Sequence, residues 1–376
     1  MNETELKPEA ARKSRRLLLP ILLALPLLLL GLFFLLRGSQ SVMDAWVFRI
    51  LAPAAQALGR LCSHVPFSVV ELLITALIAG SLIWLIYAVV RFCRQKTGTA
   101  FLRRILVLVT VWLWGLAAFY WMWNAVYYAQ TFSQRTGLTG GQHSPQELAI
   151  VTDFFAWNAA RTAGGIQRDE ELHWDEDLDD IIARGPHIYD NIVQEFPVLE
   201  MESVPVKPFF FSRLQSTIGF TGMYSPFTGE ANINADAPIC KIPATIAHEM
   251  SHQRMIASEQ EANFVGIAAC ISSDDAVYQY SGWLSGLSYL SNALYAISPD
   301  TWYSITERRF TPEVSTDWND NRDYWASFES PVEDVADSAY DSFLKHNGQT
   351  LGVQSYGACI DLLIAYYLPV IQSLNG

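Results

Sequence analysis

Three uninterrupted apolar runs occupy much of the first third of the chain, at 17–36, 72–90 and 105–123. Each run is close to the ~20 residues with which a helix crosses a bilayer. None of them contains a charged side chain, so they offer a transported solute no polar path. The pattern predicts a membrane domain over residues 1–124 with three transmembrane helices, and it argues against a transporter.

The charges between these runs predict their orientation. The segment that joins the second run to the third holds five basic residues and no acid: Arg91, Arg94, Lys96, Arg103 and Arg104. By the positive-inside rule, this segment and the N-terminus are cytoplasmic, and everything after about residue 125 is extracytoplasmic. Arg37 follows the first run without an A-x-A site, which predicts an uncleaved helix rather than a signal peptide.

The remaining segments predict a mainly α chain whose second domain, residues 125–376, has an α+β fold. Residues 38–66 have apolar side chains at helical spacing and predict either an interfacial helix or a loop packed under the soluble domain. Residues 221–229 favour turns, and residues 299–331 lack a clear period. Periodicity predicts helices at 149–161, 174–196, 243–256, 259–272, 274–298, 332–345 and 357–374, and strands at 206–211, 216–220 and 230–234.

The net charge of −13 is unevenly distributed. Residues 1–124 carry 13 Lys and Arg against 5 Asp and Glu, whereas residues 125–376 carry 12 against 33. Such acidity disfavours nucleic acid as a partner and predicts repulsion from an anionic membrane surface. The five cysteines include no C-x-x-C pair, which disfavours a cysteine zinc site. For Cys240 and Cys270 we expect buried free thiols, with a disulfide as the alternative.

The residues from His248 to His252 read H-E-x-x-H, a zinc-protease signature. On a helix that begins near Pro243, the two histidines are four residues apart and share one face, so both imidazoles can reach one ion. Glu249 is then beside the metal, where a carboxylate can take a proton from a zinc-activated water.

A catalytic zinc needs a third protein ligand. Ser258 and Glu261 form a capping-box pattern for a following helix, which leaves Glu259 available as the third ligand. Asn263 then lies on the same helix face and is expected to orient a ligand histidine. Glu261 remains the alternative ligand, and the chain has to turn sharply at 255–258.

Two further roles are left open by the pattern. Tyr224 and Arg254 are the candidates for stabilising a tetrahedral oxyanion, although a core aromatic and a salt bridge are the respective alternatives. The acid-rich stretch 318–323 lacks the spacing of a calcium loop, so calcium is disfavoured.

Several motifs together resemble an uncharacterised bacterial membrane family. These are FTGEANIN, HEMSHQR, EQEANF and NGQ-x-x-GVQSYG-x-x-x-DLLIAYY, at 227–234, 248–254, 259–264 and 347–367. The resemblance implies three N-terminal spans and a zincin-like domain of the glutamate type with no known substrate. It also implies glycine in relatives where this chain has Met255.

The expected function is a membrane-anchored zinc metallopeptidase that hydrolyses peptide bonds at the cell envelope. In this reading, His248, His252 and Glu259 hold Zn²⁺, and Glu249 is the general base. The alternative is a non-catalytic, zinc-stabilised sensor or scaffold domain of the envelope. Glu249 discriminates between them, because a structural zinc site does not need it.

Overall fold

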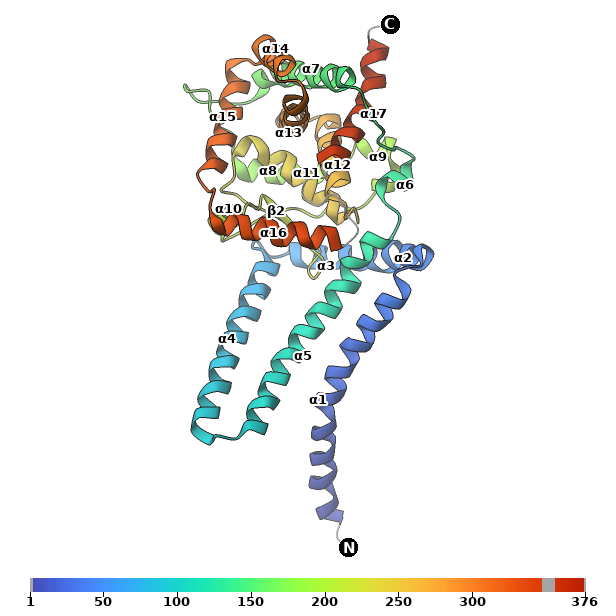
Figure 1. The fold of residues 1–376 in the computed structure, drawn as a ribbon, viewed down its shortest axis with the longest axis vertical. Helices are drawn as coiled ribbons and strands as arrows, with labels where there is room; N and C mark the ends of the chain where they lie inside the picture. Colours follow the sequence, from blue (N-terminus) through green and yellow to red (C-terminus); the bar gives the residue numbers. More distant parts are fainter. Residues whose placement is uncertain (1–2, 347–355, 375–376) are drawn as a thin grey trace. The chain divides into compact units, whose positions relative to one another are not determined.

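The computed structural model describes residues 3–346 and 356–374 (Figure 1). It has two compact units: unit 1 comprises Met1–Val47 and Val70–Ala129, and unit 2 comprises Phe48–Val69 and Gln130–Gly376. The expected domain boundary near residue 124 is close to the observed one at Ala129. Residues 48–69, expected in the membrane domain, instead group with unit 2.

Unit 1 contains the three expected apolar helices, α1 (Glu3–Leu36), α4 (Val69–Gln95) and α5 (Gly98–Met122). Their apolar stretches are long enough to cross a membrane. Phe33 of α1 is fully buried, and its ring contacts Tyr120 and Trp121 of α5 edge to face, at 5.2 and 5.6 Å between centroids. The short helix α2 (Gln40–Trp46) follows α1.

Unit 2 is mainly helical, with a small sheet. Short 3₁₀ turns separate several of its helices. The helices are α3 (Ala52–Ser63), α6 (Phe132–Thr136), α7 (Pro145–Thr162), α8 (Leu178–Arg184), α9 (Ile192–Glu195), α10 (Ser212–Thr217), α11 (Ile242–Gln253), α12 (Glu259–Ser272), α13 (Ala276–Ile297), α14 (Pro299–Arg309), α15 (Pro312–Ala326), α16 (Pro331–His346) and α17 (Tyr356–Leu374).

Most helices begin where local sequence signals place them. The side chain of Ser144 caps α7 in a reciprocal box with Glu147, and Ser258 caps α12, whose bounds are those predicted. The single helix predicted over 174–196 is wrong, because the chain passes through a 3₁₀ turn at Gly185–His187 between α8 and α9. The irregular region predicted over 299–331 is also wrong: it forms α14 and α15, each with proline at its first turn.

The sheet has three short strands, β1 (Lys207–Pro208), β2 (Gly222–Ser225) and β3 (Glu230–Ile233), in the order β1-β3-β2. β3 is parallel to β1 and antiparallel to β2, so β2 is an edge strand. The strand predicted at 230–234 is confirmed. The runs predicted as strands at 206–211 and 216–220 are mostly wrong, because only β1 and the helix α10 form there.

The core of unit 2 is centred on α11, α12 and α13. Figure 1 shows α11 and α12 side by side, with α13, α7 and α14 on one side of them and β2, α10 and α16 on the other. Gly266 of α12 lets the two central helices approach closely, since a Cβ there would lie 2.8 Å from the backbone nitrogen of His248. This close approach brings the start of α12 next to the histidine face of α11.

Residues 48–69 contain a helix, α3, where residues 38–66 were expected to form an interfacial helix or a packed loop, and this segment packs against the sheet of unit 2. Lys207 of β1 donates hydrogen bonds to the carbonyl oxygens of Cys62, at 2.7 Å, and Phe67, at 3.0 Å, and forms a buried ion pair with Glu230 at 2.7 Å. α3 is therefore attached to the sheet by polar contacts as well as by apolar ones.

Candidate metal centre

The two histidines of the H-E-x-x-H motif lie one turn apart on α11, with ring centroids 4.8 Å apart. α11 ends at Gln253, and Met255 adopts a left-handed backbone with a φ of 59°. A left-handed conformation costs a non-glycine residue about 1–2 kcal/mol, and burial of a methionine side chain gives about 1.5–3 kcal/mol in return. The turn at Met255, which is 4% exposed, therefore forms without the glycine expected in relatives.

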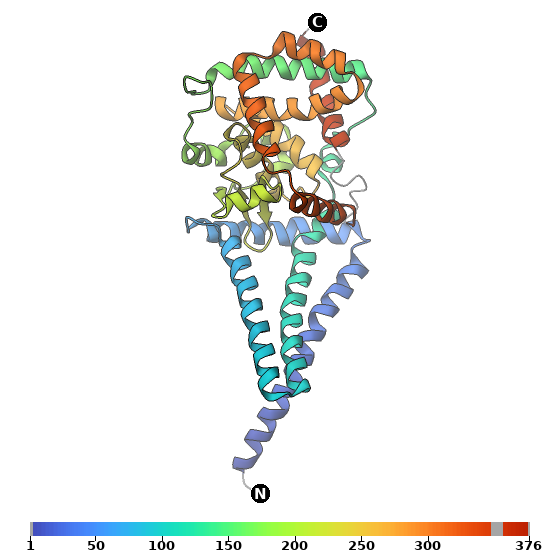
Figure 2. The same ribbon diagram turned by 60° about the vertical axis from the view of Figure 1, so that its left-hand side comes forward.

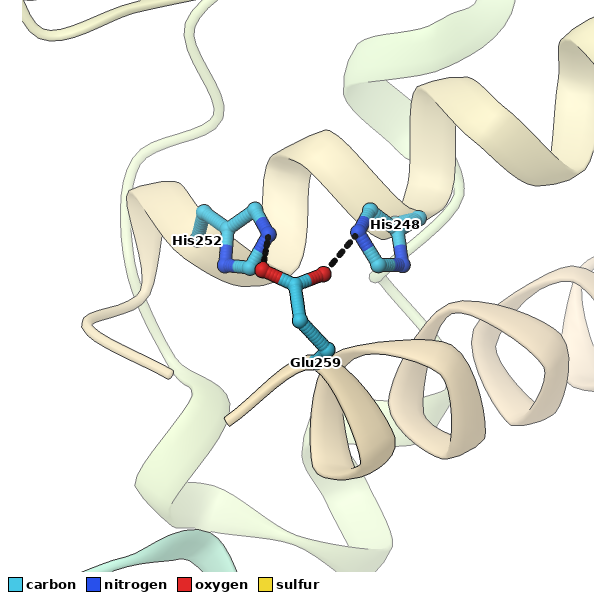
Figure 3. A group of neighbouring side chains, drawn as sticks. All are labelled: His248, His252 and Glu259. Carbon is cyan, nitrogen blue, oxygen red and sulfur yellow. Dashed lines mark ion pairs between the residues drawn. The ribbon is translucent and has the colours of Figure 1, made fainter. Parts of the chain in front are cut away.

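This turn places Glu259, the first residue of α12, opposite both rings (Figure 3). One carboxylate oxygen lies 3.3 Å from Nε2 of His248, and the other lies 3.6 Å from Nε2 of His252. The edge of a tetrahedral zinc site, with ligands at 2.0–2.1 Å, is about 3.3 Å long. The three ligand atoms all lie within 4.8 Å of one another, which makes these residues a group that can hold a metal ion.

Further contacts hold two of these side chains. Nδ1–H of His252 donates to the carbonyl of Ile256 at 2.6 Å, which leaves Nε2 to face Glu259. The hydroxyl of Tyr340, on α16, donates to Oε1 of Glu259 at 2.7 Å. Nδ1 of His248 is buried and has no hydrogen-bond partner among the described residues.

The charges of Glu259 and His252 support each other. Burial alone would raise the pKa of Glu259, but His252 and His248 hold it well below its usual range. Burial alone would lower the pKa of His252, but the Glu259 carboxylate raises it to about 9. At neutral pH Glu259 is thus ionised and His252 carries a proton, so binding a metal at these ligands has to release the His252 proton.

Glu249 is buried beside this group, on the side of the edge strand β2. Its carboxylate accepts a hydrogen bond from the backbone N–H of Tyr224, while Oε2 has no partner among the described residues. A Cβ on Gly222 would lie 2.5 Å from Oε1 of Glu249, so only glycine leaves room for the carboxylate. Burial raises the pKa of Glu249, which makes it a stronger base than an exposed carboxylate.

Glu261, the alternative ligand, and Asn263, the expected orienter of a ligand histidine, have other positions. Glu261 accepts from the backbone N–H groups of Phe132 and Ser133, at 2.8 and 2.9 Å, and so caps the start of α6. Of the capping box predicted with Ser258, the Ser258 side chain accepts from the Glu261 N–H, whereas the Glu261 carboxylate bonds α6 and not the Ser258 backbone. Asn263 is half-buried, and the orienting bond to His252 comes from Ile256 instead.

Tyr224 and Arg254 have structural surroundings, so neither is retained as the oxyanion donor. The Tyr224 side chain lines a small cavity with Ala55 and Gln253, and its backbone N–H bonds Glu249. Arg254 donates to Leu199 O, Met250 O and Ser203 Oγ at 2.9–3.0 Å, and its guanidinium lies 3.6 Å from the centre of the Tyr189 ring. All three guanidinium nitrogens are thus engaged away from the histidines.

The structure also describes the cysteines, the acid-rich stretch 318–323 and one site residue that the sequence did not indicate. All five cysteines have free thiols, as expected for Cys240 and Cys270. The stretch 318–323 is helical, and Asp320 accepts a hydrogen bond from His173 at 2.7 Å. Tyr340 was missed, because it belongs to no motif and lies 81 residues from Glu259 in sequence.

The family of the chain is established by a family model that matches more than half of its residues. The model of a family described as a protein of unknown function, DUF3810, matches residues 48–364. The chain belongs to the DUF3810 family. The match begins at the first residue of unit 2 and includes the whole candidate metal centre, so the centre is part of the DUF3810 domain. No curated protein and no solved structure matches the chain.

Proposed function

We propose that this DUF3810 protein is a membrane-anchored zinc metallopeptidase whose unit 2 lies outside the cytoplasmic membrane. The observation that carries the proposal is the convergence of three ligand atoms, from His248, His252 and Glu259, beside a buried carboxylate with an unpartnered oxygen. The zincin-like character of the domain and its extracytoplasmic location, inferred from the basic cytoplasmic segment, belong to the same proposal.

The side chains around the ligands have distinct tasks in this proposal. Zinc, when bound, supplies a Lewis acid that polarises a carbonyl and acidifies water. Glu249 accepts the proton of the attacking water and returns it to the leaving amine. Tyr340 is the candidate donor to the oxygen that gains negative charge, because its hydroxyl is already at the ligand group, 2.7 Å from Glu259.

The edge strand β2 is the proposed support for an extended peptide. Asn234 N–H bonds the carbonyl of Thr221, so the alternate residues Gly222 and Tyr224 direct their amides away from β3. The Tyr224 amide bonds Glu249, so the carboxylate lies at the outer edge of β2. A peptide that adds to this edge would have its backbone beside Glu249.

Metal content and cleavage, measured on the purified full chain, test this proposal. The wild type is expected to hold one zinc ion and to cleave members of a proteome-derived peptide library. Glu249→Gln should keep the zinc and lose about 10²–10⁴-fold in cleavage rate, the usual contribution of a general base.

The matched control is Glu261→Gln, which makes the same chemical change at an acid in the first turn of α12 that caps α6. It should keep both zinc and cleavage. Wild-type protein that binds no zinc would overturn the metal centre. Zinc-loaded wild type that cleaves no peptide, or a Glu249→Gln variant that cleaves as well as the wild type, would favour the sensor or scaffold function.

A further inference from the structure

One face of unit 2 carries large apolar side chains that are exposed. This face, called the α3 face, consists of α3 with the residues that follow it, the turn from β1 into α10, and the tip between β2 and β3. Figures 1 and 2 show α3, α10 and β2 at the same end of unit 2. Phe210 is 84% exposed, and the others of this kind are Leu61, Phe67, Phe211, Leu214 and Phe227.

Direct contacts join the three segments into one surface. Lys207, just before the β1–α10 turn, bonds the carbonyl oxygens of Cys62 and Phe67. At the tip, a Cβ on Gly59 of α3 would lie 2.9 Å from the carbonyl oxygen of Gly229, so helix and tip are in close contact. The three segments that bear the exposed apolar residues are therefore in direct contact with one another.

Two of the three joins between unit 2 and the rest of the chain, at Phe48 and Val69, flank α3. The unit is joined to the apolar helices at Phe48, Val69 and Gln130. The ring of Phe48 lies under the guanidinium of Arg135 in α6, at 4.3 Å, so the first and third joins are neighbours. The Val69 N–H bonds Glu230 of β3. These joins lead into helices long enough to cross a bilayer, so the residues that flank α3 are tethered to those helices through the chain.

We propose that the α3 face is a lipid-contact surface of unit 2 that rests in the headgroup region of the bilayer. Aromatic and leucine side chains flanked by arginines are typical of such surfaces. The joining segment 48–69 contains Arg49 and Arg60 and no acid, although residues 130–376 hold 33 acids against 12 basic residues. Arg60 also forms an exposed ion pair with Glu202 at 3.5 Å, so part of this local charge is already matched by an acid and the rest is available to anionic headgroups.

The test measures lipid proximity in the full chain, reconstituted in liposomes that contain phosphatidylglycerol. Cys62 and Cys93 are replaced by alanine, while the buried Cys240, Cys270 and Cys359 remain. An environment-sensitive fluorophore is then attached to a single cysteine at Phe210, Phe227 or Tyr303. Tyr303 on α14 is the matched control, because it is an aromatic residue, 54% exposed, at the opposite end of unit 2 (Figure 1).

A nitroxide lipid labelled near its headgroup should quench the fluorophore at Phe210 and Phe227 several-fold more strongly than at Tyr303, since interfacial side chains sit about 5–10 Å into the headgroup and acyl boundary. Quenching equal to that at Tyr303 would overturn the proposal. So would labels shielded from aqueous iodide but not quenched by lipid, because a second protein copy would then cover the face. The measurement needs no zinc and no cleavage, so its failure is separate from failure of the peptidase.

Discussion

Replacing Glu259 with glutamine is the sharpest test of the ligand assignment. Glu259→Gln keeps the size of the side chain but removes the negative charge that lies 3.3 Å from His248 and 3.6 Å from His252. Zinc binds carboxylate oxygen, thiolate and imidazole, so a neutral amide is a poor replacement. The matched control is Glu261→Gln, the same chemical change two positions along α12.

The expected size of the effect follows from binding linkage. At free zinc about 100 times the wild-type Kd, bound metal stabilises the folded chain by about 2.7 kcal/mol. Losing a residue that only orients a ligand weakens metal binding about 10–100-fold, so losing Glu259 itself should weaken it about 100-fold or more. The stabilisation at the same zinc concentration then falls to about 0.4 kcal/mol or less.

Thermal unfolding of the detergent-solubilised full chain, with and without zinc, measures this difference. One kcal/mol corresponds to about 2–4 °C in a domain of roughly this size, so zinc should raise the wild-type melting temperature by about 5–11 °C. The rise in Glu259→Gln should be about 1–2 °C at most. Glu261→Gln should melt lower than the wild type in both conditions, because α6 loses its cap, yet keep the full zinc response.

The assignment is refuted if Glu259→Gln keeps the wild-type zinc response, or if Glu261→Gln is the variant that loses it. Equal loss in both variants would also contradict it, since Glu261 is engaged by Phe132 and Ser133 away from the histidines.

Three other predictions follow from the same geometry. Gly222→Ala should displace the Glu249 carboxylate and reduce cleavage about 100-fold, because small misplacements of catalytic groups have that effect. The zinc-induced rise in melting temperature should be kept. Unchanged cleavage would contradict this prediction. Asp153 bonds Arg309 and Arg308, and these bonds lower its pKa below 3.8 against the opposing effect of burial. The stabilisation by Asp153 is fully present above its pKa in the unfolded chain and is lost as pH falls through its lowered pKa in the folded chain. Asp153→Asn should therefore lower the free energy of unfolding by about 1 kcal/mol at pH 7. Denaturant titration should show that this difference shrinks in acid. If the lipid-contact and peptidase proposals both hold, a library peptide tethered to liposomes should be cleaved faster than the same peptide in solution, because the tip of β2 lies on the α3 face; equal rates would count against that combination.

The loop regions show where pattern reading failed and why. Residues 299–331 lack an apolar period, yet they form α14 and α15 because Pro299 and Pro312 start helices that pack only one side. The segment 216–220 has apolar residues typical of a strand, but most of it belongs to α10 and its end. In the segment 216–220, tertiary contacts outweighed the weak local preference for a strand.

The sequence by itself determined the apolar helices, the histidine face of α11, and the start of α12 at its serine cap. These features depend on periodicity and capping within a few residues, which the chain encodes locally. The tertiary structure decided which acid faces the histidines, why Glu261 does not, and that Gly222 and Tyr340 belong to the site. Those contacts join residues far apart in the chain, so they depend on how α11, α12, α16 and the sheet pack, which no local pattern records.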